Sequence, residues 1–174
     1  NKKLSKKELA DQSIYLEQKV LKETVGSQDQ IAASYGGLNE IIFKKNGNYI
    51  VKPLLTNKKE LKSLERNLIL VFTGVRKNLK TANHIAKTYV SKLIYEKKSI
   101  KEIMKHADIA KKLIKEKKFD DFGLLLNETW KFKRKLSSSV TTEKLDYVYE
   151  LGIKNGALGG KLLGAGGAGF FLFY

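Results

Sequence analysis

The sequence contains no cysteine and only two histidines among its 174 residues. Without cysteine the chain can form no disulfide bond, and it offers neither a thiolate nucleophile nor ligands for a cysteine-bound zinc. The two histidines, His84 and His106, are too few for a histidine-rich metal site.

Long apolar runs are also missing. The longest mostly apolar stretch, residues 162–174, contains four glycines and is too short to cross a bilayer. The lysine-rich start leads into an amphipathic helical pattern, which is not the apolar core of a secretory signal. We therefore expect a soluble, cytoplasmic protein without a membrane partner. Because the chain starts at Asn1 and stops within a strand-like run, we also expect it to be a piece of a larger protein.

Positive charge is abundant. Lysine and arginine number 34 against 18 acidic residues, a net charge of +16. Such a balance is typical of nucleic-acid binding, so a basic RNA-binding module is one hypothesis. However, the lysines are spread along helical faces, arginine occurs only at positions 66, 76 and 134, and no aromatic platform accompanies a basic stripe. Solvated lysine faces are the favoured interpretation.

Periodic apolar runs predict an α+β chain of one domain or two small ones. Ser5 and Glu8 form a capping box that opens a helix to about residue 24. Asn46-Gly47 predicts a hairpin between strands 38–43 and 49–54, which the only proline, Pro53, closes. Beyond a charged connection, we expect a buried strand at 67–73, helices at 79–95, 99–117, from 119 onward and 142–154, and a strand at 170–174.

Glycines are concentrated near the end of the chain, with seven of the fourteen between Gly156 and Gly169. Such density indicates tight turns or close approach of a ligand to the backbone. Gly164, Gly166 and Gly169 also match the dinucleotide-binding spacing GxGxxG. In that motif a strand precedes the glycines and a helix follows, whereas here the predicted order is reversed, so the dinucleotide hypothesis is disfavoured. A helix-to-strand connection without a ligand is the other open interpretation.

One carboxylate stands out as a candidate for chemistry. Asp29 lies in a polar loop between Gln28 and Gln30, where a carboxylate could accept a proton or orient a hydroxyl. The alternative is that Asp29 caps a short helix beginning at Gln30. Glu17, twelve residues earlier, is unremarkable by itself. The triplet Asp121-Phe122-Gly123 matches the metal-binding triplet of protein kinases, but it lies in a helical pattern without the catalytic-loop signature, and we treat it as coincidence.

Four segments together resemble the later portion of a GHMP-type small-molecule kinase, the superfamily of galactokinase, homoserine kinase and mevalonate kinase. They are VGSQDQIAASYGGLNEIIF, LVFTGVRK, NETWKFKRKLSSS and KNGALGGKLLGAGGAGFFLFY. The QDQ and GGLN segments and the final glycine loop are similar in particular to the D-glycero-D-manno-heptose 7-phosphate kinase family. The resemblance implies a fragment of the GHMP kinase fold. Residues 1–57 would be the end of its N-terminal domain and residues 58–174 its ferredoxin-like C-terminal domain.

This resemblance implies transfer of the γ-phosphoryl group of ATP to the anomeric hydroxyl of heptose 7-phosphate, a precursor of surface polysaccharides. A kinase of fucose or galactose type is the alternative within the superfamily. Asp29 matches the aspartate beside the acceptor hydroxyl, as base or as orienter. Glu17 matches the glutamate that helps to hold Mg²⁺, which neutralises charge on the nucleotide phosphates.

The resemblance also implies binding residues. The loop residues Gly164, Ala165, Gly166 and Gly167 match the third motif and would contact the cofactor ATP. The positions that would contact the sugar substrate are Tyr35, Gly36, Gly37, Thr73, Gly74 and Arg76. Arg76 could clamp the sugar phosphate through its guanidinium, or simply be a surface arginine. Ala168 replaces a glycine that is usual in the family. The family's first motif and phosphate loop would precede Asn1, so we expect the chain alone to be inactive without that partner segment.

Overall fold

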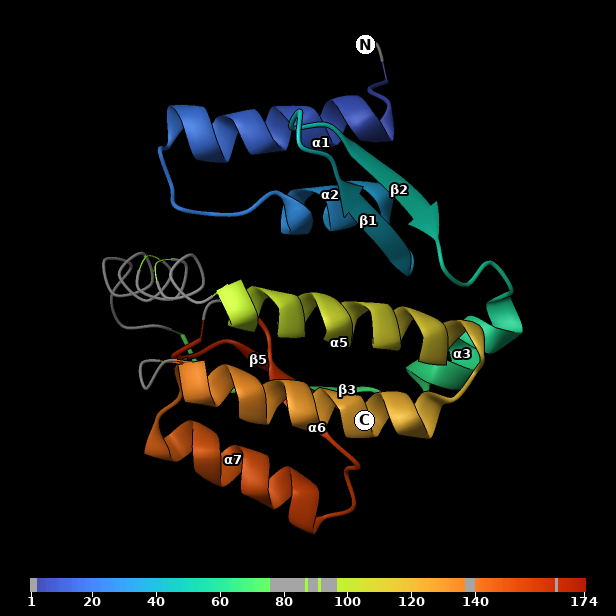
Figure 1. Ribbon diagram of the computed structural model, residues 1–174, viewed down its shortest axis with the longest axis vertical. Coiled ribbons are helices and arrows are strands. Elements are labelled where there is room, and N and C mark those ends of the chain that lie inside the picture. The colour runs from blue at the N-terminus through green and yellow to red at the C-terminus, as the bar shows by residue number, and fades with distance from the viewer. Residues whose placement is uncertain (1–2, 76–86, 88–90, 92–96, 137–139, 165) are drawn as a thin grey trace. The chain divides into compact units, whose positions relative to one another are not determined.

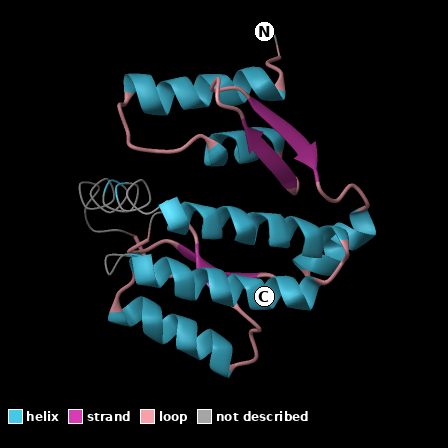
Figure 2. Cartoon of the chain, viewed as in Figure 1, coloured by secondary structure: helices cyan, strands magenta, loops and turns pink. Residues whose placement is uncertain are grey.

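The computed structural model describes residues 3–75, 87, 91, 97–136, 140–164 and 166–174. The chain divides into two units, Asn1–Asn57 and Lys58–Tyr174 (Figure 1). Each unit combines helices with a small antiparallel sheet (Figure 2), which confirms the predicted α+β class. No helix among these described residues is long and apolar enough to span a membrane.

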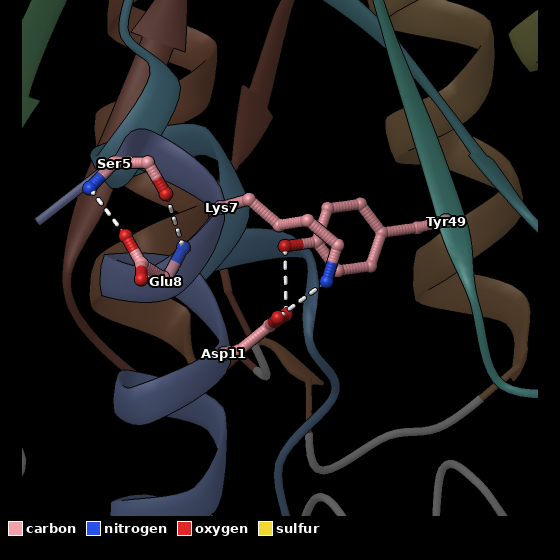
Figure 3. Close-up of polar contacts among 5 residues, drawn as sticks. All are labelled: Ser5, Lys7, Glu8, Asp11 and Tyr49. Carbon is pink, nitrogen blue, oxygen red and sulfur yellow. Dashed lines mark hydrogen bonds and ion pairs between the residues drawn. The ribbon is translucent and has the colours of Figure 1, made fainter.

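The first unit begins with helix α1 (Lys6–Tyr15), whose predicted capping box is confirmed. The Ser5 hydroxyl accepts from the Glu8 N–H at 3.2 Å, and the Glu8 carboxylate accepts from the Ser5 N–H at 2.8 Å (Figure 3). The helix was predicted to reach residue 24, which is wrong. It continues only as a π-helical turn, η1 (Leu16–Val20), and Lys22 then takes a left-handed φ of 55° that ends it.

The hairpin predicted at Asn46-Gly47 is confirmed. Strands β1 (Asn39–Phe43) and β2 (Tyr49–Pro53) pair antiparallel, and Gly47 adopts a φ of 82° in the turn. The Tyr49 hydroxyl donates to the Asp11 carboxylate of α1 at 2.9 Å, and Lys7 donates to the same carboxylate (Figure 3). The hydrogen bond of Tyr49 connects the hairpin to α1, whereas the contact of Lys7 with Asp11 lies within the helix.

The second unit contains helices α3 (Lys58–Glu65), α5 (Lys97–Lys115), α6 (Phe119–Leu136) and α7 (Glu143–Lys154). Its sheet has the strand order β3-β5-β4, formed by Ile69–Phe72, Phe170–Phe173 and Gly160–Leu162, all antiparallel. Helix α5 packs on α6, and α6 packs on β4. The core consists of Trp130, Val140, Leu145, Tyr149, Leu162, Phe171 and Phe173.

Three expectations for this unit need correction. The charged connection contains helix α3, because Leu61 and Leu64 share a helical face and Leu64 is buried. The strand predicted to be buried, β3, is largely exposed at one edge of the sheet, and Leu70 and Phe72 are 60% and 57% exposed. The glycine loop joins two strands, β4 and β5, because residues 160–162 form a strand that the sequence analysis did not predict. The predicted helix 79–95 lies largely outside the described residues.

Gly123 of the kinase-like triplet lies within α6. A Cβ there would come within 2.5 Å of the Tyr174 ring, and a Cβ on Gly159 would meet the Gly123 carbonyl oxygen at 2.0 Å. Close packing of backbone against its neighbours therefore accounts for this glycine without any metal-binding role.

Candidate active site

In the first unit, a cavity of about 470 Å³ brings together the two carboxylates singled out in the sequence. Glu17 comes from η1 and Asp29 from helix α2 (Gln28–Tyr35). The remaining lining residues are Leu9, Ser13, Val25, Gln30, Ala33 and Ser34. Two carboxylates, two hydroxyls and an amide in one cavity can bind a hydroxyl-bearing ligand and a cation.

Glu17 is half-buried and held in place by a neighbouring amide. The Gln30 side chain donates from Nε2 to Glu17 Oε2 at 2.5 Å. Gln30 itself is 7% exposed, and its Oε1 has no hydrogen-bond partner among the described residues. The π-helical turn carrying Glu17 is a rare backbone form that often occurs at functional sites. Sequence reasoning did not single out Gln30, although it adjoins Asp29.

Asp29 is exposed in the first turn of α2, and the helix begins earlier than expected. Its N-cap is Ser27, so the alternative that Asp29 caps a helix starting at Gln30 is wrong. Within the described part of the chain, Asp29 makes no hydrogen bond or ion pair. Its carboxylate is thus available to a ligand, and the N-terminus of α2 stabilises its negative charge.

The other predicted residues of this unit lie at the opposite end of α2. Tyr35 is its last residue, and the Tyr35 carbonyl accepts from Lys6 Nζ at 2.5 Å. Gly36 and Gly37 follow with φ values of 65° and 75°, which only glycine adopts readily. These three residues do not line the cavity of Glu17 and Asp29.

In the second unit, the glycine loop is fixed to separate elements. Thr73, directly after β3, donates to the Gly169 carbonyl from its N–H at 2.8 Å and from its hydroxyl at 2.9 Å. The Gly167 N–H donates to the Val140 carbonyl at 2.9 Å. The structure therefore brings Thr73, predicted on the sugar side, onto the loop predicted to contact the nucleotide.

Glycine is required at several loop positions. Gly164, Gly166 and Gly167 have φ values of 71°, 111° and 77°, and a Cβ on Gly166 would lie 2.8 Å from the Val140 backbone. Gly74 also has a positive φ, 114°. The two remaining predicted site residues, Ala165 and Arg76, lie outside the described residues.

Lys133 is a residue of this region that sequence reasoning missed. It is buried in α6 and donates to the carbonyls of Leu162 at 3.3 Å and Gly164 at 2.5 Å. Its position could have signalled this role, because it occupies the apolar face of the helix three residues after the buried Trp130. Half-buried Lys161, in β4, also adjoins the loop, and burial lowers the pKa of its ammonium group.

The cavity of Glu17 and Asp29 can hold a magnesium ion only if a bound ligand supplies further oxygen atoms. The described residues contain no group of three or more potential metal-binding side chains. Mg²⁺ is commonly held by one or two carboxylates together with substrate phosphates and water. Glu17 and Asp29 on one cavity can provide such carboxylates.

Comparison with known proteins shows what the chain is similar to. Residues 110–174 match the family described as GHMP kinases C terminal. The whole chain is 32% identical, over 176 aligned residues, to D-glycero-alpha-D-manno-heptose 7-phosphate kinase of Campylobacter jejuni, and covers 51% of that protein. It is 29% identical over 153 residues to the bifunctional fucokinase/GDP-fucose pyrophosphorylase of Arabidopsis thaliana, covering 84% of the chain and 14% of that protein.

A solved structure shares both fold and sequence. The crystal structure of a D-glycero-D-manno-heptose 1-phosphate kinase from Bacteriodes thetaiotaomicron aligns with 98% of this chain and 44% of its own, with a TM-score of 0.60 and 26% identity. The chain thus spans about half the length, or less, of the proteins it matches.

Proposed function

We propose that the chain supplies part of an ATP-dependent sugar kinase, starting from the match of residues 110–174 to the family described as GHMP kinases C terminal. We propose D-glycero-D-manno-heptose 7-phosphate as the acceptor. The heptose kinase of Campylobacter jejuni, similar along the entire chain, supports this substrate. The observation that carries the proposal is the shared cavity of Glu17 and Asp29, two carboxylates from separate elements.

In this proposal Asp29 acts on the acceptor sugar. Its exposed carboxylate accepts a hydrogen bond from the anomeric hydroxyl and takes up or orients that proton as the oxygen attacks the phosphorus. Phosphoryl transfer requires mainly positioning and charge stabilisation, so one well-placed carboxylate suffices on the acceptor side.

Glu17 serves the nucleotide side. When bound, Mg²⁺ would neutralise charge on the ATP phosphates. Glu17 would hold the ion, and Gln30 keeps the Glu17 carboxylate in one orientation. A preorganised carboxylate needs no rearrangement during the reaction.

The two units would correspond to two domains of the kinase. Residues 1–57 would be the end of the N-terminal domain and residues 58–174 the ferredoxin-like C-terminal domain. The loop residues Gly164, Ala165, Gly166 and Gly167 would then contact the nucleotide. Tyr35, Gly36, Gly37, Thr73, Gly74 and Arg76 would lie toward the sugar. We also propose that the protein is cytoplasmic and acts in the synthesis of surface-polysaccharide precursors.

One comparison supports a second candidate for the acceptor sugar. The fucokinase of Arabidopsis thaliana is similar to 84% of the chain, so fucose is the alternative acceptor. Substrate turnover by the complete protein distinguishes the two. We expect ATP consumption, measured with a coupled ADP assay, to require heptose 7-phosphate and to be absent with fucose, galactose or unphosphorylated heptose.

Turnover of fucose alone would shift the proposal to the fucokinase type. Absence of turnover with every sugar, together with tight and strongly salt-dependent RNA binding, would favour a basic RNA-binding module.

A further inference from the structure

A buried cation holds the beginning of the glycine loop. Lys133 is 7% exposed, which is unusual because lysine is rarely fully buried. Its ammonium group donates to the carbonyl oxygens of Leu162 and Gly164. Hydrogen bonds from a charged donor are stronger than those between neutral groups. The contact therefore fixes the end of β4 and the first residue of the loop against α6.

The rest of the loop is held by neutral groups. Val140 accepts from the Gly167 N–H, and Thr73 donates twice to the Gly169 carbonyl. The loop is thus fixed at its start, middle and end by three separate segments. Lys133 provides the charged contact among these three.

The positive charge of Lys133 also matters because the glycine loop carries no charged side chain of its own. Residues 164–169 read GAGGAG and carry no charged side chain. An anionic ligand approaching the loop therefore finds no cation within the loop itself. The ammonium group, 2.5 Å from the Gly164 carbonyl oxygen, adds positive potential at the loop.

We propose that Lys133 is a positioning residue for the phosphate-bearing nucleotide, acting through the glycine loop. It sets the conformation of the loop entry and supplies the positive charge beside it. The proposal rests on the proposed kinase function, since it assigns the loop a phosphate-bearing ligand.

The experiment uses the complete protein with Lys133→Met, Lys133→Arg and a matched control, Lys135→Met. Lys135 lies two residues further along α6 and is exposed. Loss of the charged hydrogen bonds should raise the KM for ATP about tenfold in Lys133→Met. Lys133→Arg should recover part of this loss because it keeps the charge, and Lys135→Met should match the wild type. The KM for the sugar should stay unchanged in all three.

A second readout concerns the loop itself. Hydrogen exchange should become faster at residues 160–170 in Lys133→Met and remain unchanged in Lys135→Met. If Lys133→Met does not fold, Lys133→Arg tests the proposal. A raised KM for ATP together with an unfolding curve like that of the wild type would support it. If folded Lys133→Met has the same KM for ATP as the wild type, the proposal is overturned. A loss of activity that is confined to kcat would also overturn it. An inactive wild-type protein would overturn the kinase function, and this inference with it, whatever the exchange data show.

Discussion

The Glu17 carboxylate depends on one neighbour for its orientation. Gln30 is buried, donates to Glu17, and leaves its own carbonyl oxygen without a partner among the described residues. A buried polar atom without a hydrogen bond destabilises the fold by about 1–3 kcal/mol. Such a group is retained most readily where a ligand or water completes its bonding, which places Gln30 within the site.

Replacing this amide should weaken cation binding by the complete protein. In Gln30→Leu the Glu17 carboxylate loses its donor while the buried volume is nearly kept. Substitutions of groups that orient a metal ligand reduce metal affinity about 10-fold or more. We therefore expect the Mg²⁺ concentration for half-maximal activity to rise about tenfold. Mn²⁺ binding measured by electron paramagnetic resonance should weaken in parallel.

Gln28→Leu is the matched control, since Gln28 is an exposed glutamine in the same turn of α2. It should leave the cation dependence unchanged. Equal effects of the two substitutions would show that Gln30 does not orient Glu17.

At the scale of elements, the segment before β4 lies so close to the backbone of α6 that position 159 has no room for a side chain. A Cβ on Gly159 would lie 2.0 Å from the Gly123 carbonyl oxygen and 2.8 Å from the Asn127 nitrogen. Both neighbours are backbone atoms of α6, which cannot move aside as a flexible side chain can. Glycine at this position lets the chain approach α6 just before β4.

Gly159→Ala should therefore destabilise the second unit by about 2 kcal/mol or more. Urea unfolding followed by fluorescence measures this directly, because Trp130 is the only tryptophan and is fully buried. Lys154→Ala, an exposed position at the end of α7, should change stability by less than about 0.5 kcal/mol. An unfolding curve of Gly159→Ala that overlays the wild type would contradict the close contact.

Lys161 gives the second unit a pH-dependent stability. Burial lowers the pKa of its ammonium group below the ordinary value of 10.5. Between the two pKa values the unfolded state binds more protons than the folded state, so this contribution to stability rises with pH. Lys161→Met should therefore stabilise the unit more at about pH 7 than at about pH 10.

The same Trp130 fluorescence measures this difference, with exposed Lys131→Met as the control. A gain from Lys161→Met that is identical at both pH values would show that the lysine titrates as it does in the unfolded chain.

Local patterns predicted the elements that depend on short-range chemistry. The Ser5 and Glu8 capping box and the Asn46-Gly47 hairpin both appear in the structure. Two of the errors concern contacts between distant residues. The apolar composition of β3 did not reveal that the strand is largely exposed, and β4 exists because it pairs with β5.

The candidate site shows the same division. Local patterns drew attention to Asp29 and the glycines, and the family resemblance added Glu17. Gln30 and Lys133 became visible only through their partners. Lys133 lies 29 residues before Leu162 along the chain, and no local pattern reports such a pairing.

At the scale of the whole molecule, the chain spans about half of the heptose kinase it resembles. We expect the 174-residue chain alone to bind ATP poorly and to phosphorylate no sugar, because it spans only about half the length of that kinase. Isothermal titration of the chain with ATP and Mg²⁺ checks this. Tight Mg²⁺-dependent binding would contradict it and would place a complete nucleotide site within these residues.

The central claim is that the Asp29 carboxylate acts on the acceptor sugar in a phosphoryl transfer from ATP. The most direct test is phosphorus NMR of the complete protein with ATP, Mg²⁺ and heptose 7-phosphate, comparing wild type, Asp29→Asn and the control Glu143→Gln. Glu143 is likewise an exposed acid in the first turn of a helix. We predict an anomeric phosphate signal for the wild type and Glu143→Gln, and a rate at least about 100-fold lower for Asp29→Asn. Failure of the wild type to form that product, or an undiminished rate in Asp29→Asn, would contradict the account.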